Sequence, residues 1–87
     1  MKFIIARNGS NSANQHMCQR AIVGVIEAKD YAEAESYAYE VFHCYNNQHL
    51  EINQGSKASR ADKREAQGLE VLNVEDDNAA LDAVYAN

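Results

Sequence analysis

The side chains best suited to chemistry in this sequence form two pairs of histidine and cysteine, His16 with Cys18 and His43 with Cys44. Imidazole nitrogen and thiolate sulfur are common zinc ligands, and a hairpin could bring the two pairs together. Neighbouring residues on a helix point about 100° apart, so His43 and Cys44 do not converge on one ion. The chain also lacks a Cys-x-x-Cys motif. We predict free thiols and no metal site, and a single disulfide between the two cysteines stays open.

Nucleophilic catalysis needs a base aimed at the nucleophile and donors that stabilise the developing charge. The sequence supplies only loose combinations, such as Cys18 with His16 or His49. Asp76 and Asp77 are adjacent carboxylates, but a helix cap and a turn explain them better. No glycine-rich loop that could hold a phosphate is visible. We therefore predict a protein that is not an enzyme and uses no cofactor.

The charge balance is acidic, because 13 aspartates and glutamates stand against 8 lysines and arginines, for a formal net charge of −5. Contacts with phosphates need concentrated basic residues, so direct nucleic-acid binding is not expected. An acidic chain more naturally meets a basic protein surface, although charge also keeps a small protein soluble. The chain shows no signal-peptide pattern and no apolar run of membrane-spanning length. We expect a cytoplasmic protein without membrane contact, and a homo-oligomer is compatible with this.

An amphipathic helix from Tyr31 to Tyr45 is the element that the rest of the chain must pack around. Asp30, with Glu33 three residues later, is an acidic form of the capping box that satisfies free N–H groups at a helix start. Apolar residues then recur at helical spacing along one stripe, which predicts a face turned to the core. That predicted core stripe consists of Tyr31, Ala34, Ala38, Val41, Phe42 and Tyr45.

The outward side of the same helix is the predicted partner-binding surface. Tyrosine gives a large contact area at low entropic cost, and neighbouring carboxylates would steer the helix toward a basic partner. An ordinary solvated helix face is the alternative interpretation. The predicted binding residues are Glu33, Ser36, Tyr37, Glu40 and Cys44.

Four apolar stretches predict strands, one pair before the helix and one pair after it. The order strand, strand, helix, strand, strand indicates an α+β domain with a four-stranded, mostly antiparallel sheet and the helix on one face. A chain of this length forms one domain over residues 1–87, and residues 78–87 could add a short C-terminal helix. The predicted strands are Lys2–Arg7, Ala21–Ile26, His49–Asn53 near a sheet edge, and Leu69–Val74.

The segment from Lys57 to Gln67 holds four of the eight basic residues but has no apolar stripe. Such a segment is either a solvated helical turn or a flexible arm. We expect its lysines and arginines to be exposed and mobile rather than part of the core.

Residues 25–42, VIEAKDYAEAESYAYEVF, combine a strand, an acidic cap and an alanine-rich and glutamate-rich helix. This passage resembles small phage-encoded host-takeover and anti-defence proteins, among them the short RNA-polymerase inhibitors of T7-like phages and the anti-CRISPR proteins. The resemblance covers roughly residues 2–53. It implies a non-enzymatic inhibitor that occupies a surface of a host protein complex, such as RNA polymerase or a CRISPR effector complex.

The polymerase inhibitors use arginines in and after the strand that follows the helix, whereas that strand reads HLEINQ here and has no arginine. Their binding residues therefore do not carry over at these positions. The acidic helix face at Glu33 and Glu40 does have a counterpart in kind. Two other functions stay open, a domain that binds or sequesters a small molecule and a minor nucleic-acid-binding module.

Overall fold

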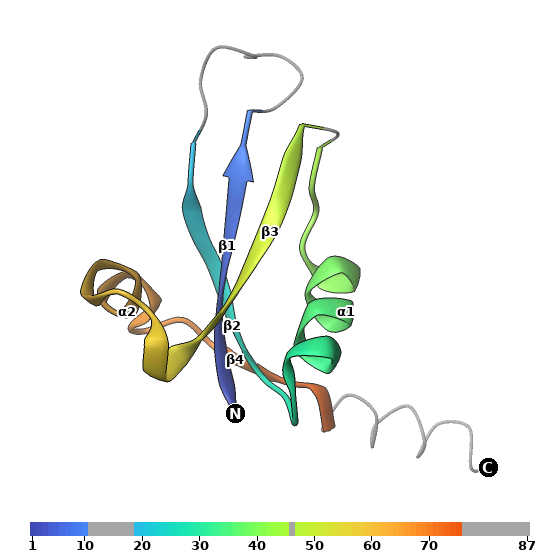
Figure 1. Cartoon of the computed structure of the whole chain (residues 1–87), viewed down its shortest axis with the longest axis vertical. Helices are drawn as coiled ribbons and strands as arrows, with labels where there is room; N and C mark the ends of the chain where they lie inside the picture. The colour runs from blue at the N-terminus through green and yellow to red at the C-terminus, as the bar shows by residue number, and fades with distance from the viewer. Residues whose placement is uncertain (11–18, 46, 76–87) are drawn as a thin grey trace, which may run out of the picture.

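Four strands form one mixed sheet in the order β3-β1-β2-β4, and the two helices lie on opposite sides of it (Figure 1). The computed structural model describes residues 1–10, 19–45 and 47–75. The α+β class and the four-stranded sheet are as predicted. The elements are β1 (Lys2–Gly9), β2 (Ala21–Glu27), α1 (Tyr31–Val41), β3 (Gln48–Gln54), a 3-10 turn (Gly55–Lys57), α2 (Arg60–Ala66) and β4 (Val71–Asn73).

Strand β1 is central and runs antiparallel to both β2 and β3. Strand β4 joins the outer edge of β2 in parallel, with Ile26 opposite Leu72. Strands β3 and β4 therefore point the same way, and a crossover connection must join them, because a tight turn connects only antiparallel strands. The 3-10 turn and α2 supply that crossover on the sheet face opposite α1 (Figure 1).

The core lies between the sheet and α1. Phe3 and Ile5 on β1 and Ile26 on β2 are almost completely buried, and Ala34 and Ala38 meet them from the helix. Residues alternate between the two faces of a strand, which sends Ile4 and Val25 to the opposite face. The alanines let α1 approach the sheet closely, so the large side chains of the strands fill most of this core.

The course of α1 departs from prediction at its C-terminal end. The helix ends at Val41, and Phe42 has extended backbone angles (φ −108°, ψ 123°). Residues after Val41 therefore no longer follow helical spacing. Ala34 and Ala38 are buried as predicted and Phe42 packs against the core, but Tyr31, Val41 and Tyr45 are exposed. The predicted core stripe is wrong at these three positions, and the buried face of α1 includes Tyr37 instead.

Of the two alternatives for this segment, the structure shows the helical one, α2, and its lysines and arginines are exposed as expected. Ser59 caps it by accepting a hydrogen bond from the Asp62 N–H at 3.2 Å. Asp62 is buried and forms two hydrogen bonds of 2.7 Å with the Arg20 guanidinium next to β2. Arg20 also donates to Glu51 on β3, which accepts a further bond from Asn8 on β1. This anchor network of Asn8, Arg20, Glu51 and Asp62 holds α2 in place without an apolar stripe.

The anchor network predicts a specific loss of stability in acid. Arg20 holds the pKa of Asp62 below its ordinary 3.8, and Asn8, followed by Arg20, holds the pKa of Glu51 below its ordinary 4.5. The unfolded chain therefore binds protons more readily than the folded chain as the pH falls. The stabilisation from these carboxylates is complete at neutral pH, begins to fall near their ordinary pKa values, and is lost below their folded ones. Urea unfolding from pH 7 to pH 2 should show a smaller loss in Arg20→Ala than in wild type.

Candidate functional site

The exposed side of α1 carries a surface of aromatic and acidic side chains. Four of the seven exposed large hydrophobic residues among those described belong to α1 or the segment just after it, namely Tyr31, Tyr39, Val41 and Tyr45. Tyr31, Glu35 and Tyr39 follow one another at intervals of four residues and so form a continuous line along the helix. We define the tyrosine surface as this line of Tyr31, Glu35 and Tyr39 together with the exposed Glu40 and Val41 of the last turn, which point away from the line around the helix axis.

Both helix tyrosines of this surface are held in position by contacts within the protein. The Tyr31 hydroxyl donates to Glu35 at 3.2 Å, and its ring meets Phe3 edge-on with a centroid separation of 6.4 Å. The Tyr39 hydroxyl accepts the Leu50 N–H of edge strand β3 at 3.1 Å. Partial desolvation of the phenol, reinforced by the Glu35 charge, raises the pKa of Tyr31 above its ordinary value of 10.0. Tyr31 is therefore a neutral hydrogen-bonding group at physiological pH.

A shallow hollow of about 370 Å³ lies at the C-terminal end of α1, lined by residues 39–44. The unpaired carbonyl groups at a helix C-terminus carry a partial negative charge. The last turn of α1 contains no basic residue to offset this charge, and Glu40 adds a carboxylate. The Arg7 guanidinium of β1 donates to the His43 carbonyl at 3.0 Å, so a basic group of the protein itself already offsets part of this charge.

The predicted binding residues do not all lie on the exposed side. Glu40 and Ser36 are exposed. Glu33 accepts the Lys29 N–H at 3.1 Å and pairs with the Lys29 ammonium at 3.9 Å, so its carboxylate is engaged at the helix start. Tyr37 and Cys44 are partly buried and pack against the core, which corrects their placement on an outward face. The binding role of all five residues stays a prediction.

Tyr31 and Tyr39 are central to the tyrosine surface, although the sequence did not predict either residue there. The helical spacing predicts Tyr31 in the core stripe and assigns no role to Tyr39. Their spacing from Glu35 was a usable signal, since residues four apart on a helix are neighbours. What the sequence did not show was the rotation of α1 about its axis, which brings Tyr37 to the core and turns Tyr31 and Tyr39 outward.

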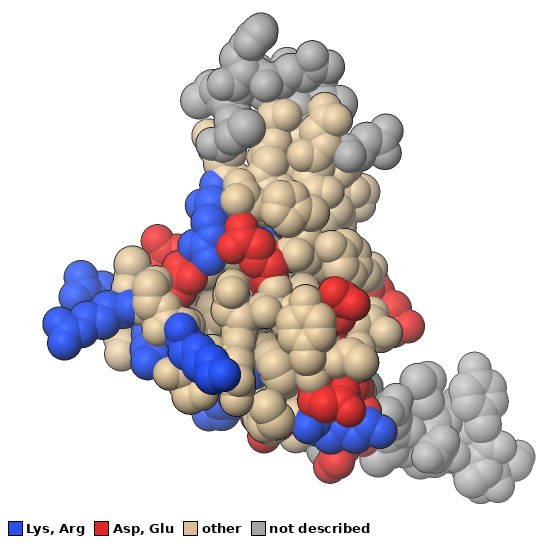
Figure 2. Space-filling model, in the orientation of Figure 1, with Lys and Arg blue, Asp and Glu red and all other residues tan. Residues whose placement is uncertain are grey.

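Charge is distributed unevenly over the molecule. Figure 2 shows acidic side chains over the α1 region at the right, while most basic side chains visible in this view lie around α2 at the left. Since the tyrosine surface contains Glu35 and Glu40 and no basic residue, its local field is negative. A negative field of this kind attracts basic groups and repels acidic ones.

Other kinds of site find little support in the part of the chain that the structure describes. No three histidine, cysteine or acidic side chains within residues 1–10, 19–45 and 47–75 are grouped so that they could hold a metal ion. His16, Cys18, Asp76, Asp77 and the tail 78–87 lie outside the described residues, so the predictions about them stay predictions. Neither helix in the described ranges is long and apolar enough to cross a membrane.

Comparison with known proteins adds no assignment. No family model matches the chain, and no curated protein and no solved structure matches it.

Proposed function

We propose that this chain is a non-enzymatic inhibitor that uses the tyrosine surface to cover a basic patch on a larger protein complex. The observation that carries this proposal is the placement of two partly exposed tyrosines, each already held by a hydrogen bond, on either side of Glu35 along one line of α1, with the exposed Glu40 in the adjoining last turn. Tyrosine is enriched among the residues that dominate interface energies. A side chain that is ordered before binding also loses less entropy when the partner docks.

The charge of the surface narrows the class of partner. Complexes that handle nucleic acid present basic surfaces to the phosphate backbone, and an acidic protein surface can occupy such a patch in place of the nucleic acid. RNA polymerase and CRISPR effector complexes are of this kind. They are also the targets implied by the resemblance to phage-encoded host-takeover proteins, and this role implies action in the cytoplasm of the host cell.

Charge reversal on the tyrosine surface tests the proposal directly. Glu35→Lys with Glu40→Lys should slow association with a purified RNA polymerase or CRISPR effector complex by about tenfold at low salt, because electrostatic steering is lost. The matched control is Glu65→Lys with Glu70→Lys, which changes the net charge equally at two exposed residues outside α1. Association rates would be measured by surface plasmon resonance at several salt concentrations. Equal slowing in both double variants would indicate a general charge effect and contradict the proposed surface.

Removing a tyrosine that anchors the interface should change the dissociation rate rather than the association rate. Tyr39→Ala is expected to increase the dissociation rate by tenfold or more, the loss of about 1.4 kcal/mol or more of binding free energy. Tyr45→Ala removes an equally exposed tyrosine that lies outside the tyrosine surface and serves as the control. Circular dichroism would establish that both variants stay folded. An unchanged complex lifetime in Tyr39→Ala would place the contact elsewhere.

A further inference from the structure

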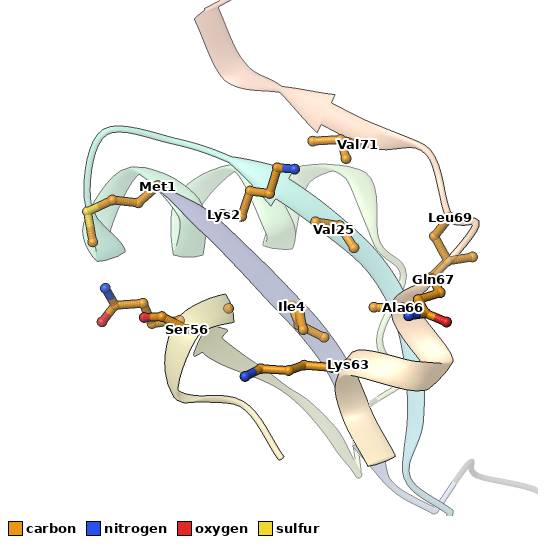
Figure 3. A pocket seen from close by; sticks show the side chains of 12 residues that line it. Met1, Lys2, Ile4, Val25, Ser56, Lys63, Ala66, Gln67, Leu69 and Val71 are labelled. Carbon is orange, nitrogen blue, oxygen red and sulfur yellow. The ribbon is translucent and has the colours of Figure 1, made fainter. Parts of the chain in front are cut away.

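We propose that the sheet face opposite α1 carries a second site, a groove that binds a small amphiphile with an apolar chain and one anionic end, such as a long-chain carboxylate. The groove has a volume of about 600 Å³ and lies between the sheet, α2 and the 3-10 turn (Figure 3). It is on the other side of the sheet from the tyrosine surface and is independent of the function proposed for that surface.

The floor and wall of the groove are apolar. Ile4 on β1 and Val25 on β2 form the floor and are only 5% and 6% exposed. Leu69 and Val71 line one side and Met1 lies at an end, and these three account for the remaining exposed large hydrophobic residues in the described ranges. Covering such side chains with hydrocarbon contributes about 25 cal/mol for each Å² removed from water. Leu69, Val71 and Met1, which are 39–51% exposed, supply most of the area that an apolar ligand chain could cover.

The groove stays open because polar bonds rather than apolar packing position α2. The Arg20–Asp62 pair holds the helix against the strands, and α2 presents Ala66, together with the stem of Lys63, to the groove. The short Ala66 side chain occupies little of the space between α2 and the sheet. The unfilled volume is thus a consequence of how the crossover is anchored.

The charge around the groove has one sign. Lys2 and Lys63 line it, and no aspartate or glutamate does, although acidic residues outnumber basic ones in the whole chain. Figure 3 shows the two lysines on either side of Ile4, with Lys63 extending across the groove from α2. Neither ammonium has an ion-pair partner among the described residues. An apolar floor between two unpaired cations matches a ligand with a hydrocarbon chain and an anionic end.

The size of the groove favours a small molecule over a protein segment. Pockets for small ligands typically measure about 300–1,000 Å³, and this groove falls within that range. A stable protein interface needs about 800 Å² on each partner, which would extend well beyond the lining residues. Gln54, Ser56 and Gln67 supply additional neutral donors at the rim for an anionic group.

The test is an NMR titration of the full chain with sodium dodecanoate, kept below the concentration at which it forms micelles. We expect saturable shifts in the methyl signals of Ile4, Val25, Leu69 and Val71, with the α1 signals unchanged. Dodecyltrimethylammonium, which has the same chain and the opposite charge, should bind at least tenfold more weakly. Equal binding of both probes, or no saturable shift at the four methyl-bearing residues, would overturn the proposal.

Two variants of α2 distinguish a specific contact between the ligand and Lys63 from a general effect of charge. Lys63→Glu should weaken dodecanoate binding by about tenfold, a loss of about 1.4 kcal/mol. Arg64→Glu makes the same charge change one residue along the helix, outside the groove, and should leave the affinity within twofold. Equal weakening in both variants would contradict the groove as the binding site. A response to an acidic amphipathic peptide without any response to dodecanoate would also overturn the proposal.

Discussion

Replacing Phe42 with alanine should lower the free energy of unfolding by about 3 kcal/mol. Phe42 is partly buried, packs against the core, and follows directly after α1, so its ring ties the end of the helix to the sheet. Its loss would remove apolar contacts and leave space that the rigid strands cannot close. Urea unfolding monitored by circular dichroism would measure the change. A loss below 1 kcal/mol would show that the ring contributes little to this packing.

A double variant tests the contact between the Phe42 ring and Gly24 on β2 more directly. A Cβ atom built at Gly24 would overlap the Phe42 ring, so this glycine provides the space in which the ring lies. Gly24→Ala should therefore destabilise the wild-type protein and cost much less in the Phe42→Ala background, where the ring is absent. Residues in direct contact show such coupling, whereas independent sites add. Additive losses in the double variant would contradict the contact.

Replacing Asp62 with alanine should lower stability by about 2 kcal/mol, the scale of hydrogen bonds to a charged group. Arg20 would lose both short bonds that hold α2 against the sheet, although it stays partly solvated and keeps its bond to Glu51. Local opening of α2 should then precede global unfolding. Limited trypsin digestion should cut Asp62→Ala first at Arg60, Lys63 or Arg64, faster than wild type.

Glu65→Ala is the matched control for this prediction. Glu65 lies on the same helix, is exposed, and has no hydrogen bond or ion pair within the described part of the chain. Its replacement should change stability by less than about 0.5 kcal/mol and leave the digestion rate near that of wild type. Equal digestion of Asp62→Ala and wild type would mean that the Arg20–Asp62 pair does not hold α2 in place.

The alternation and periodicity of apolar residues in the sequence were sufficient to predict the elements around the core. The apolar run of β1, the start of α1 at its Asp30 cap and the inward positions of Ala34 and Ala38 follow from local patterns, and the structure confirms them. These features depend on neighbours a few residues apart, which sequence reasoning can see. The α+β class follows from the order of the elements for the same reason.

The candidate surfaces depended on contacts between distant residues. Phe42 packs over Gly24, 18 residues away in the chain, just after the early end of α1, and Tyr37 rather than Val41 or Tyr45 packs against the core. A helical stripe specifies a periodicity, but its exact phase is decided by what the opposing sheet can accommodate. The tyrosine surface therefore could not be read correctly from helical spacing alone.

The basic segment from Lys57 to Gln67 is a second case in which sequence patterns did not show a contact between distant residues. It has no apolar stripe, and its sequence is compatible with either a solvated helical turn or a flexible arm, yet Asp62 meets Arg20 across 42 residues and holds α2 on the sheet. Strand β4 then pairs in parallel with β2 and the groove forms between α2 and Ile4. The sequence by itself determined the strands, the helix start and the acidic balance, because these are local properties. Only the tertiary structure decided which side chains face solvent and where a groove opens, because an ion pair and a ring contact between distant residues set those positions.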